Sequence, residues 1–174
     1  MHYFNPAHIM PLVEIHRCKN TRDDVVETAK ELMAKAGKKT ALVRKEVPGF
    51  IVNRIQGAIY REISDILEQG ITTPEDLDTA VKASLGFRYS CIGPMEAEDM
   101  IGLDTSAKVS ARVYKTLSTR TEPNSLLLEK VKRGELGINS GKGWYDYGKK
   151  TRSEVMEEKN RKLLRQLVAS RKEK

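Results

Sequence analysis

The sequence predicts a mainly α-helical fold that is preceded by a short strand–helix–strand segment. A clear boundary lies at Val47, Pro48 and Gly49, because proline and glycine together interrupt regular structure. Before this boundary, two short apolar runs flank an amphipathic stretch. After it, apolar residues recur at helical spacing almost to the end of the chain. We therefore expect an α/β segment at residues 1–47 and a helical domain at residues 48–174.

The first region contains the elements of a small α/β layer. Residues 10–16 and 40–43 are rich in apolar and β-branched side chains, which is typical of strands. Between them we expect a helix that the Thr21 hydroxyl caps and that Gly37 ends. Two short strands do not form a stable sheet alone. The apolar stripe of the expected helix comprises Val25, Ala29, Leu32, Met33 and Ala36.

The second region is expected to consist of successive helices. The first covers residues 50–68 and stops before Gly70. Thr73 and Pro74 mark a strong helix start, because a capping hydroxyl precedes a proline at the first helical position. Further helices are expected to open at Gly93-Pro94 and to cover residues 106–117, 125–132 and 151–172.

The composition is that of a soluble globular protein, with 39% hydrophobic and 32% charged residues. No apolar run approaches the ~20 residues of a membrane helix. Much of the net charge of +7 lies in the tail, which has no aromatic residue after position 150. A solvated helix face is therefore favoured over nucleic-acid binding. Cys18 and Cys91 are isolated, so we expect reduced thiols, no disulfide or metal role and a cytoplasmic location.

The start of the chain is the most informative segment for function. His2 is a candidate general base, because histidine titrates near neutral pH. Glu14 could fix its tautomer and stabilise the imidazolium if the intervening loop folds back, and Asn5 could then orient a substrate oxygen. On spacing alone, a frayed terminal histidine is the better interpretation. His8 and His16 remain open as alternatives.

Four segments in a fixed order carry a family resemblance. They are His2–Pro6 with Leu12–Glu14, Val47–Arg54, Gly93–Asp104 and Gly141–Tyr147. They are similar, respectively, to the catalytic segment, the domain junction, the helical-domain motif and the glycine-rich C-terminal motif of the 3-hydroxyacyl-CoA dehydrogenase family. The resemblance spans nearly the whole chain, and it implies the mainly α C-terminal domain of that family behind a remnant of its NAD-binding domain.

The resemblance also implies roles for individual residues. The catalytic base of the family falls on His2, and the glutamate that pairs with it falls on Glu14. The motif asparagines fall on Asn5 and Asn53, where they are expected to bind substrate. The implied reaction removes the hydroxyl proton of a 3-hydroxyacyl-CoA through His2 while a hydride passes to NAD. The family further implies a homodimer that forms through the helical domain.

The cofactor site is where the sequence departs from the family. In members of the family, a Rossmann-type NAD domain with a glycine-rich loop that binds the pyrophosphate precedes the catalytic segment. No such loop precedes His2, so we expect a truncated or split chain that alone neither binds NAD nor turns over substrate. Either the natural protein is longer or a separate NAD-domain chain is its partner. Gly137–Lys142 resembles a phosphate loop but is one residue short, and Gly143 replaces the needed Ser or Thr. A structural turn that packs Trp144 and Tyr145 is the better interpretation.

The substrate is left open by the segment around Arg88. This segment is also similar to the branch of the lens λ-crystallins and L-gulonate 3-dehydrogenase, and Arg88 could hold a free carboxylate, although a surface arginine is the simpler interpretation. Three hypotheses remain: a 3-hydroxyacyl-CoA dehydrogenase such as a 3-hydroxybutyryl-CoA dehydrogenase, a non-catalytic dimerisation module, and a dehydrogenase of a non-CoA 3-hydroxy acid. The sequence specifies neither acyl length nor NAD over NADP.

Overall fold

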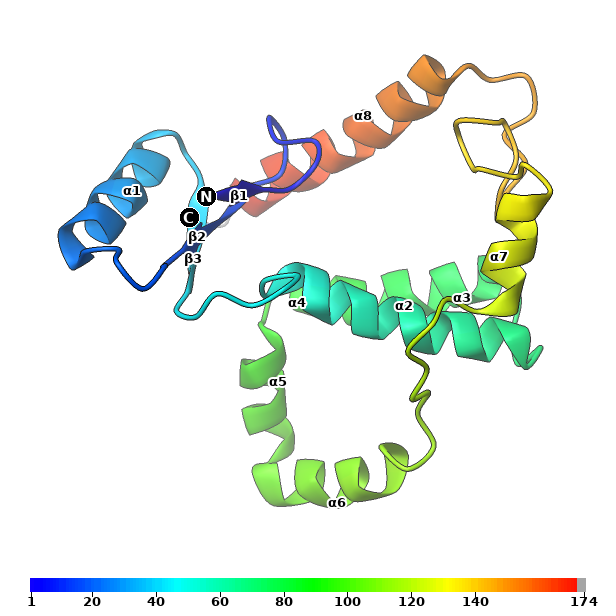
Figure 1. Ribbon diagram of the computed structural model, residues 1–174, viewed down its shortest axis with the longest axis horizontal. Coiled ribbons are helices and arrows are strands. Elements are labelled where there is room, and N and C mark those ends of the chain that lie inside the picture. Colours follow the sequence, from blue (N-terminus) through cyan, green and yellow to red (C-terminus); the bar gives the residue numbers. More distant parts are fainter. Residues whose placement is uncertain (172–174) are drawn as a thin grey trace. The chain divides into compact units, whose positions relative to one another are not determined.

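The computed structural model describes residues 1–171, which are mainly helical and include a small three-stranded sheet (Figure 1). The predicted fold class is confirmed. The chain divides into two compact units, one formed by Met1–Gly57 with Tyr147–Lys174 and the other by Ala58–Asp146. Within the described range, no helix combines the length and apolar character needed to cross a membrane.

The sheet of the first unit has the strand order β1–β2–β3. β1 (His2–Tyr3) pairs antiparallel with β2 (Leu12–His16), and β2 pairs in parallel with β3 (Lys39–Val43). The register places His2 opposite Glu14. β1 was not predicted, because two residues are too few to show the alternation that identifies a strand.

The core of the first unit surrounds the central strand β2. Val13 and Glu14 are fully buried there, and Ile15 is buried beside them. A carboxylate in the middle of an apolar core requires hydrogen-bond partners, because an isolated buried charge is very costly. The apolar side chains of this core are Ile9, Val13, Ile15, Val26, Met33 and Val43.

Helix α1 (Asp23–Lys35) joins β2 to the parallel strand β3. The prediction that Thr21 caps it is wrong: the cap residue is Arg22, and the Thr21 hydroxyl instead accepts a hydrogen bond from the Cys18 amide at 3.0 Å. Gly37 ends the helix as predicted, with a φ of 69° that suits glycine at this position.

The apolar stripe of α1 is only partly as predicted. Met33 is buried, but Val26 rather than Val25 enters the core. Val25 and Leu32 are 50% and 54% exposed, so they contribute little to this core. The periodicity identified the helix correctly, yet two adjacent valines left the rotation of the helix about its axis undetermined.

The remaining helices largely follow the predicted boundaries. Thr73 caps α3, and its hydroxyl accepts a hydrogen bond from the Asp76 amide at 3.2 Å. The π-helical turn η1 was not predicted, and α6 begins earlier than expected because Gly102, with a φ of 96°, separates it from α5. Position 172 of the last predicted helix lies outside the described residues. The elements are α2 (Val52–Glu68), α3 (Pro74–Val81), η1 (Lys82–Gly86), α4 (Phe87–Tyr89), α5 (Pro94–Ile101), α6 (Leu103–Val113), α7 (Ser125–Lys132) and α8 (Arg152–Arg171).

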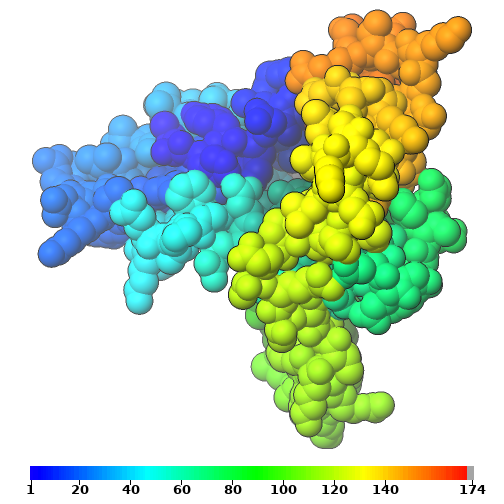
Figure 2. All heavy atoms as spheres, turned by 45° about the vertical axis from the view of Figure 1, so that its right-hand side comes forward, coloured from blue at the N-terminus to red at the C-terminus, as the bar shows by residue number. Residues whose placement is uncertain are grey.

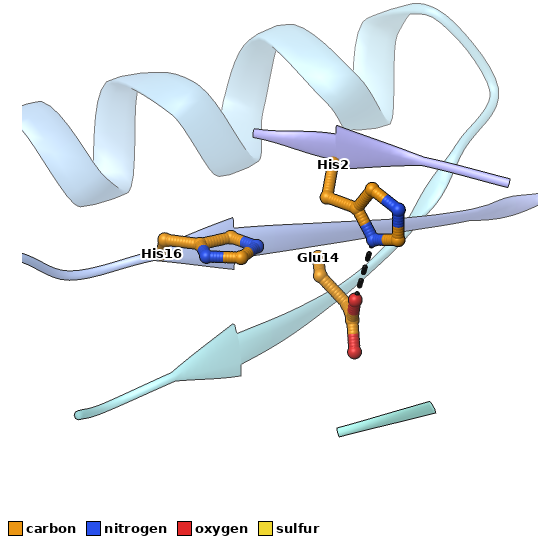
Figure 3. A group of neighbouring side chains, drawn as sticks. All are labelled: His2, Glu14 and His16. Carbon is orange, nitrogen blue, oxygen red and sulfur yellow. Dashed lines mark hydrogen bonds and ion pairs between the residues drawn. The ribbon is translucent and has the colours of Figure 1, made fainter. Parts of the chain in front are cut away.

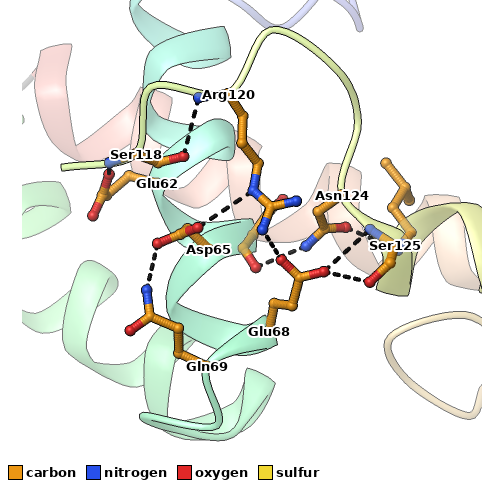
Figure 4. Close-up of polar contacts among 10 residues, drawn as sticks. Glu62, Asp65, Glu68, Gln69, Ser118, Arg120, Asn124 and Ser125 are labelled. Carbon is orange, nitrogen blue, oxygen red and sulfur yellow. Dashed lines mark hydrogen bonds and ion pairs between the residues drawn. The ribbon is translucent and has the colours of Figure 1, made fainter.

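A polar network fastens the segment before α7 to the C-terminal half of α2 (Figure 4). Glu62 accepts a hydrogen bond from the Ser118 amide at 2.8 Å. The guanidinium of Arg120 pairs with Asp65 at 3.3 Å and also with Glu68. These carboxylates follow one another at three-residue spacing, which places them on one face of α2. The long connection from α6 is thereby held against the helix.

Asn124 is the buried member of this network, with only 2% of its surface exposed. Its side-chain amide donates to the Ser64 carbonyl at 2.7 Å. Its side-chain oxygen accepts from the Leu127 amide at 2.9 Å and so caps α7. One side chain therefore both starts α7 and attaches it to α2.

The glycine-rich segment after α7 forms a closed structural turn. Lys142 makes antiparallel bridges with Gly137 and with Asp146. A Cβ atom at Gly143 would lie 2.7 Å from the Gly137 Cα, so any larger residue would displace backbone. The Lys130 ammonium lies 5.2 Å from the centre of the Trp144 ring. These contacts agree with a turn whose role is packing.

Candidate active site

The centre of the candidate site is a hydrogen-bonded pair on β1 and β2. Nδ1 of His2 lies 2.8 Å from Oε2 of Glu14 (Figure 3). The two residues are opposite each other in the antiparallel register, and directly opposed side chains in such a pair lie close together on one face. The loop between the strands therefore folds back in the way that the sequence argument required.

Glu14 is held from its other side by the start of α2. Its Oε1 accepts hydrogen bonds from the amides of Ile51 and Val52, both at 3.0 Å. Amides at a helix start are free to donate and carry partial positive charge. Burial raises the pKa of Glu14, but the hydrogen bonds from His2, Val52 and Ile51 outweigh it and leave the pKa below its ordinary value. Glu14 is therefore ionised at neutral pH.

The ionised carboxylate also fixes the proton on the histidine ring. A carboxylate accepts hydrogen bonds and does not donate them, so Nδ1 of His2 carries the hydrogen. Nε2 of a neutral His2 is then free to accept a proton. The His2 side chain is 28% exposed, and its ring lies 4.8 Å from that of Phe4 and 5.2 Å from that of Phe50. The pair is thus shielded from water while His2 remains reachable.

The boundary segment has a structural role that sequence reasoning missed. Gly49 and Phe50 adopt positive φ angles of 77° and 51°, and this sharp turn presents the next two amides to Glu14. Gly49 has the flexibility that such a conformation needs. The proline–glycine pair just before a predicted helix was a usable signal, because helix starts bind carboxylates.

His16 lies beside the pair, on the same strand as Glu14. Its ring packs edge-on against Phe50 with centroids 3.6 Å apart, and its centroid is 6.3 Å from that of His2. Burial, followed by the positive charge of the amino terminus, lowers the pKa of His16. Glu14 hydrogen-bonds His2, which favours His2 over His16 as the relay histidine, and His8 is exposed.

The other predicted site residues lie on exposed parts of the two units. Asn5 is exposed in the turn after β1, and Asn53 is exposed in the first turn of α2. Both belong to the same unit as His2. Arg88 lies in α4 of the second unit, on a hollow of about 220 Å³ that Ile92 and Met100 also line. The structure therefore brings His2 and Glu14 together and leaves Asn5, Asn53 and Arg88 exposed.

Comparison with known proteins identifies two matching family models. The model described as 3-hydroxyacyl-CoA dehydrogenase, NAD binding domain, matches residues 1–47, and the model of the C-terminal domain matches residues 49–147. Residues 1–47 were expected to be a remnant of the NAD-binding domain, and they match the model of that domain, so the expectation that the chain is truncated needs partial correction.

Individual relatives agree with these matches. A 5-formyl-3-hydroxy-2-methylpyridine 4-carboxylate 5-dehydrogenase of Mesorhizobium japonicum is 38% identical over 94% of this chain and 53% of its own. A 3-hydroxybutyryl-CoA dehydrogenase of Bradyrhizobium diazoefficiens is 38% identical over 84% of this chain and 49% of its own. A crystal structure of a 5-dehydrogenase of the former kind superposes with a TM-score of 0.88, at 38% identity over 94% of this chain and 53% of that one. The chain thus spans about half the length of the curated relatives it matches.

The lowered pKa of Glu14 predicts how the free energy of unfolding changes with pH. A carboxyl whose folded pKa is lowered stabilises the fold above its unfolded pKa of about 4.3, and this stabilisation is lost as pH falls through the folded pKa. We expect Glu14→Gln to lower the free energy of unfolding by about 1–3 kcal/mol at neutral pH, because charge-assisted hydrogen bonds are weakened. The difference from the unmodified chain should shrink below about pH 4.

Urea unfolding followed by circular dichroism across this pH range measures the effect. Glu27→Gln is the matched control, because Glu27 is an exposed residue of α1 that pairs with Lys30 at 2.7 Å on the same helix. A destabilisation by Glu14→Gln that stays constant from neutral to acidic pH would show that the carboxylate charge is not involved.

Proposed function

Since this chain belongs to the 3-hydroxyacyl-CoA dehydrogenase family, we propose that it carries the proton-transfer machinery of an NAD-dependent dehydrogenase. The 2.8 Å hydrogen bond between His2 and the buried Glu14 carries the proposal. We assign residues 1–47 to the NAD-binding domain and residues 48–174 to the helical C-terminal domain.

The geometry supports His2 as the general base. Its Nδ1–H is engaged with Glu14, so Nε2 can accept the hydroxyl proton of a substrate. The imidazolium that forms then faces an anionic carboxylate, which stabilises it without taking the proton. Asn5 and Asn53 have exposed amide side chains in the same unit, and we assign them to orienting substrate oxygens.

NAD, when bound, would accept the hydride from the substrate carbon. Residues 1–47 do not form a complete NAD site, because they include no glycine-rich loop that leads from a strand into a helix N-terminus. We therefore propose that upstream sequence or a separate chain supplies this loop. The genome sequence before Met1 distinguishes the two sources, and the lack of either would favour a non-catalytic dimerisation module.

The proposed substrate is a 3-hydroxyacyl-CoA such as 3-hydroxybutyryl-CoA, as named for the Bradyrhizobium relative. To test this, the chain is joined to the preceding NAD-binding sequence of that relative, and NADH formation is measured. His2→Gln should lower kcat by about 10²–10⁴-fold, the usual contribution of a general base. His8→Gln, which alters an exposed histidine of the adjoining loop, should leave it unchanged. A His2→Gln enzyme with full activity would exclude His2 as the base.

A second candidate substrate is a hydroxy acid with a free carboxylate and no CoA. The Mesorhizobium relative is named for a pyridine carboxylate substrate, and Arg88 presents an exposed guanidinium on an otherwise apolar hollow. A guanidinium can bind a carboxylate through two parallel hydrogen bonds. In this alternative, Arg88 selects substrates through their carboxylate while His2 and Glu14 keep their roles.

Arg88→Met in the same fused enzyme tests the alternative. We expect kcat/KM for hydroxy acids to fall by about tenfold or more, as charged hydrogen bonds are lost, while kcat/KM for the CoA thioester stays constant. Arg112→Met is the matched control, since Arg112 is an exposed arginine of α6. Unchanged turnover of hydroxy acids by Arg88→Met would remove this alternative.

We further propose that the chain forms a homodimer through its helices. No residue of α2 is buried, although Ile55 and Ile59 lie on it, and α5 and α6 extend away from the other helices of their unit (Figures 1 and 2). Met100 and Leu103 there are 73% and 61% exposed. Apolar surface of this kind usually marks an interface.

Light scattering at micromolar concentration should give the mass of two chains. Ile59→Lys should shift the mass towards one chain, because it places a charge on the apolar face of α2. Arg61→Lys is the control, because Arg61 is an exposed residue of the same helix, and this substitution should leave the mass unchanged. A mass equal to one chain for the unmodified protein would refute the dimer.

A further inference from the structure

A third side chain with a ligand atom lies beside the His2–Glu14 pair, and the proton relay makes no use of it. His2, Glu14 and His16 each offer a nitrogen or oxygen atom, and these atoms lie within 4.8 Å of one another. The outer nitrogen of the His16 ring points toward the pair (Figure 3). That nitrogen, Nε2, is buried and has no hydrogen-bond partner. A buried polar atom left unpaired costs about 1–3 kcal/mol, so its presence requires an explanation.

We propose that His2, Glu14 and His16 bind a divalent transition-metal ion, with Zn²⁺ as the best match. Two imidazoles and one carboxylate form a donor set that binds zinc with a fourth position open to water. Imidazole nitrogen favours zinc over magnesium or calcium, which prefer oxygen. Tetrahedral bonds of 2.0–2.1 Å place the ligand atoms ~3.3 Å apart. His2 Nδ1 and Glu14 Oε2 are closer than this, at 2.8 Å, and the whole set of ligand atoms lies within 4.8 Å. Small rotations of the two imidazole rings would adjust these separations.

The surroundings prepare Glu14 to act as a ligand. Its Oε1 is fixed by hydrogen bonds from the amides of Ile51 and Val52, while its Oε2 accepts the hydrogen bond from His2. The carboxylate is therefore ionised and oriented before any ion arrives. The ring of Phe50 lies against both histidines and limits access of water, which strengthens the attraction between a cation and Glu14. Hydrogen bonds to the outer oxygen of a ligating carboxylate are typical of metal sites.

Metal binding would stop the proton relay, a consequence that rests on the proposed function. As the metal–nitrogen bond forms at Nδ1 of His2, that nitrogen gives its hydrogen to solvent and Nε2 takes up a proton from solvent, so the imidazole stays neutral. Nε2 of the ligated ring then carries the one ring hydrogen and no longer accepts a proton from substrate. The ion would therefore inhibit reversibly, and a chelator would restore activity.

Binding is tested on the untagged chain with Cys18→Ser and Cys91→Ser, since both cysteines are exposed thiols that bind zinc themselves. Co²⁺ serves as the spectroscopic probe, and calorimetry measures Zn²⁺ affinity. We expect one ion per chain and the visible absorption of four-coordinate cobalt, which Zn²⁺ abolishes. His16→Gln should weaken Zn²⁺ binding at least about tenfold, as losses around metal ligands do. His8→Gln should leave it unchanged.

Nitrogen NMR of the histidine rings provides a reading that is independent of activity and of protein stability. The Nε2 resonance of His16 should shift on addition of Zn²⁺. The proposal would be overturned if the chain with all its histidines intact showed no saturable Zn²⁺ binding. It would also be overturned if the His16→Gln and His8→Gln chains bound Zn²⁺ with equal affinity. In the fused dehydrogenase, Zn²⁺ should inhibit the enzyme that retains His16 more strongly than it inhibits the His16→Gln enzyme. Failure of the dehydrogenase assay itself would leave the binding measurement intact, so the two proposals are judged separately.

Discussion

The buried carboxylate of Glu14 is the interaction on which the site depends. It lies on the central strand of a small sheet, where an unpartnered charge would oppose folding. Two backbone amides at the start of α2 and one imidazole satisfy it. The imidazole and the two adjacent amides come from different parts of the chain, so one side chain links the strand register, the turn at Gly49 and the helix start. The same contacts that make the charge tolerable also orient His2.

The parts of this arrangement that sequence reasoning predicted are those with a local signal. The helices showed periodicity and capping residues, as at Thr73, and the proline–glycine boundary was visible directly. The pairing of His2 with Glu14 needed a long-range register that spacing alone left open, and only the family motifs favoured it. Helix rotation was a further limit, since neighbouring Val25 and Val26 are equally apolar and only packing decides which one is buried.

Backbone contacts explain most of what sequence reasoning missed. The amides of Ile51 and Val52 bind Glu14, and any residue except proline supplies such a donor, so side-chain identity gives no indication of it. His16 was considered only as an alternative to His2. Its position two residues after Glu14 places both side chains on the same face of β2, a consequence of the two-residue period of a strand. That period, applied to the sequence, would have grouped the two residues.

The division of the chain into units also bears on how activity and specificity relate. His2, Glu14, His16 and the turn that holds them all lie within Met1–Gly57, so the proposed proton transfer depends on contacts inside one unit. Arg88 belongs to the other unit, which has its own polar network around Asn124 and its own glycine turn. In the proposed alternative, a change at Arg88 would therefore alter the choice of substrate and leave the contacts between His2 and Glu14 as they are. The relatives are named for different substrates, a CoA thioester and a pyridine carboxylate, which agrees with the rule that a fold alone does not determine a substrate.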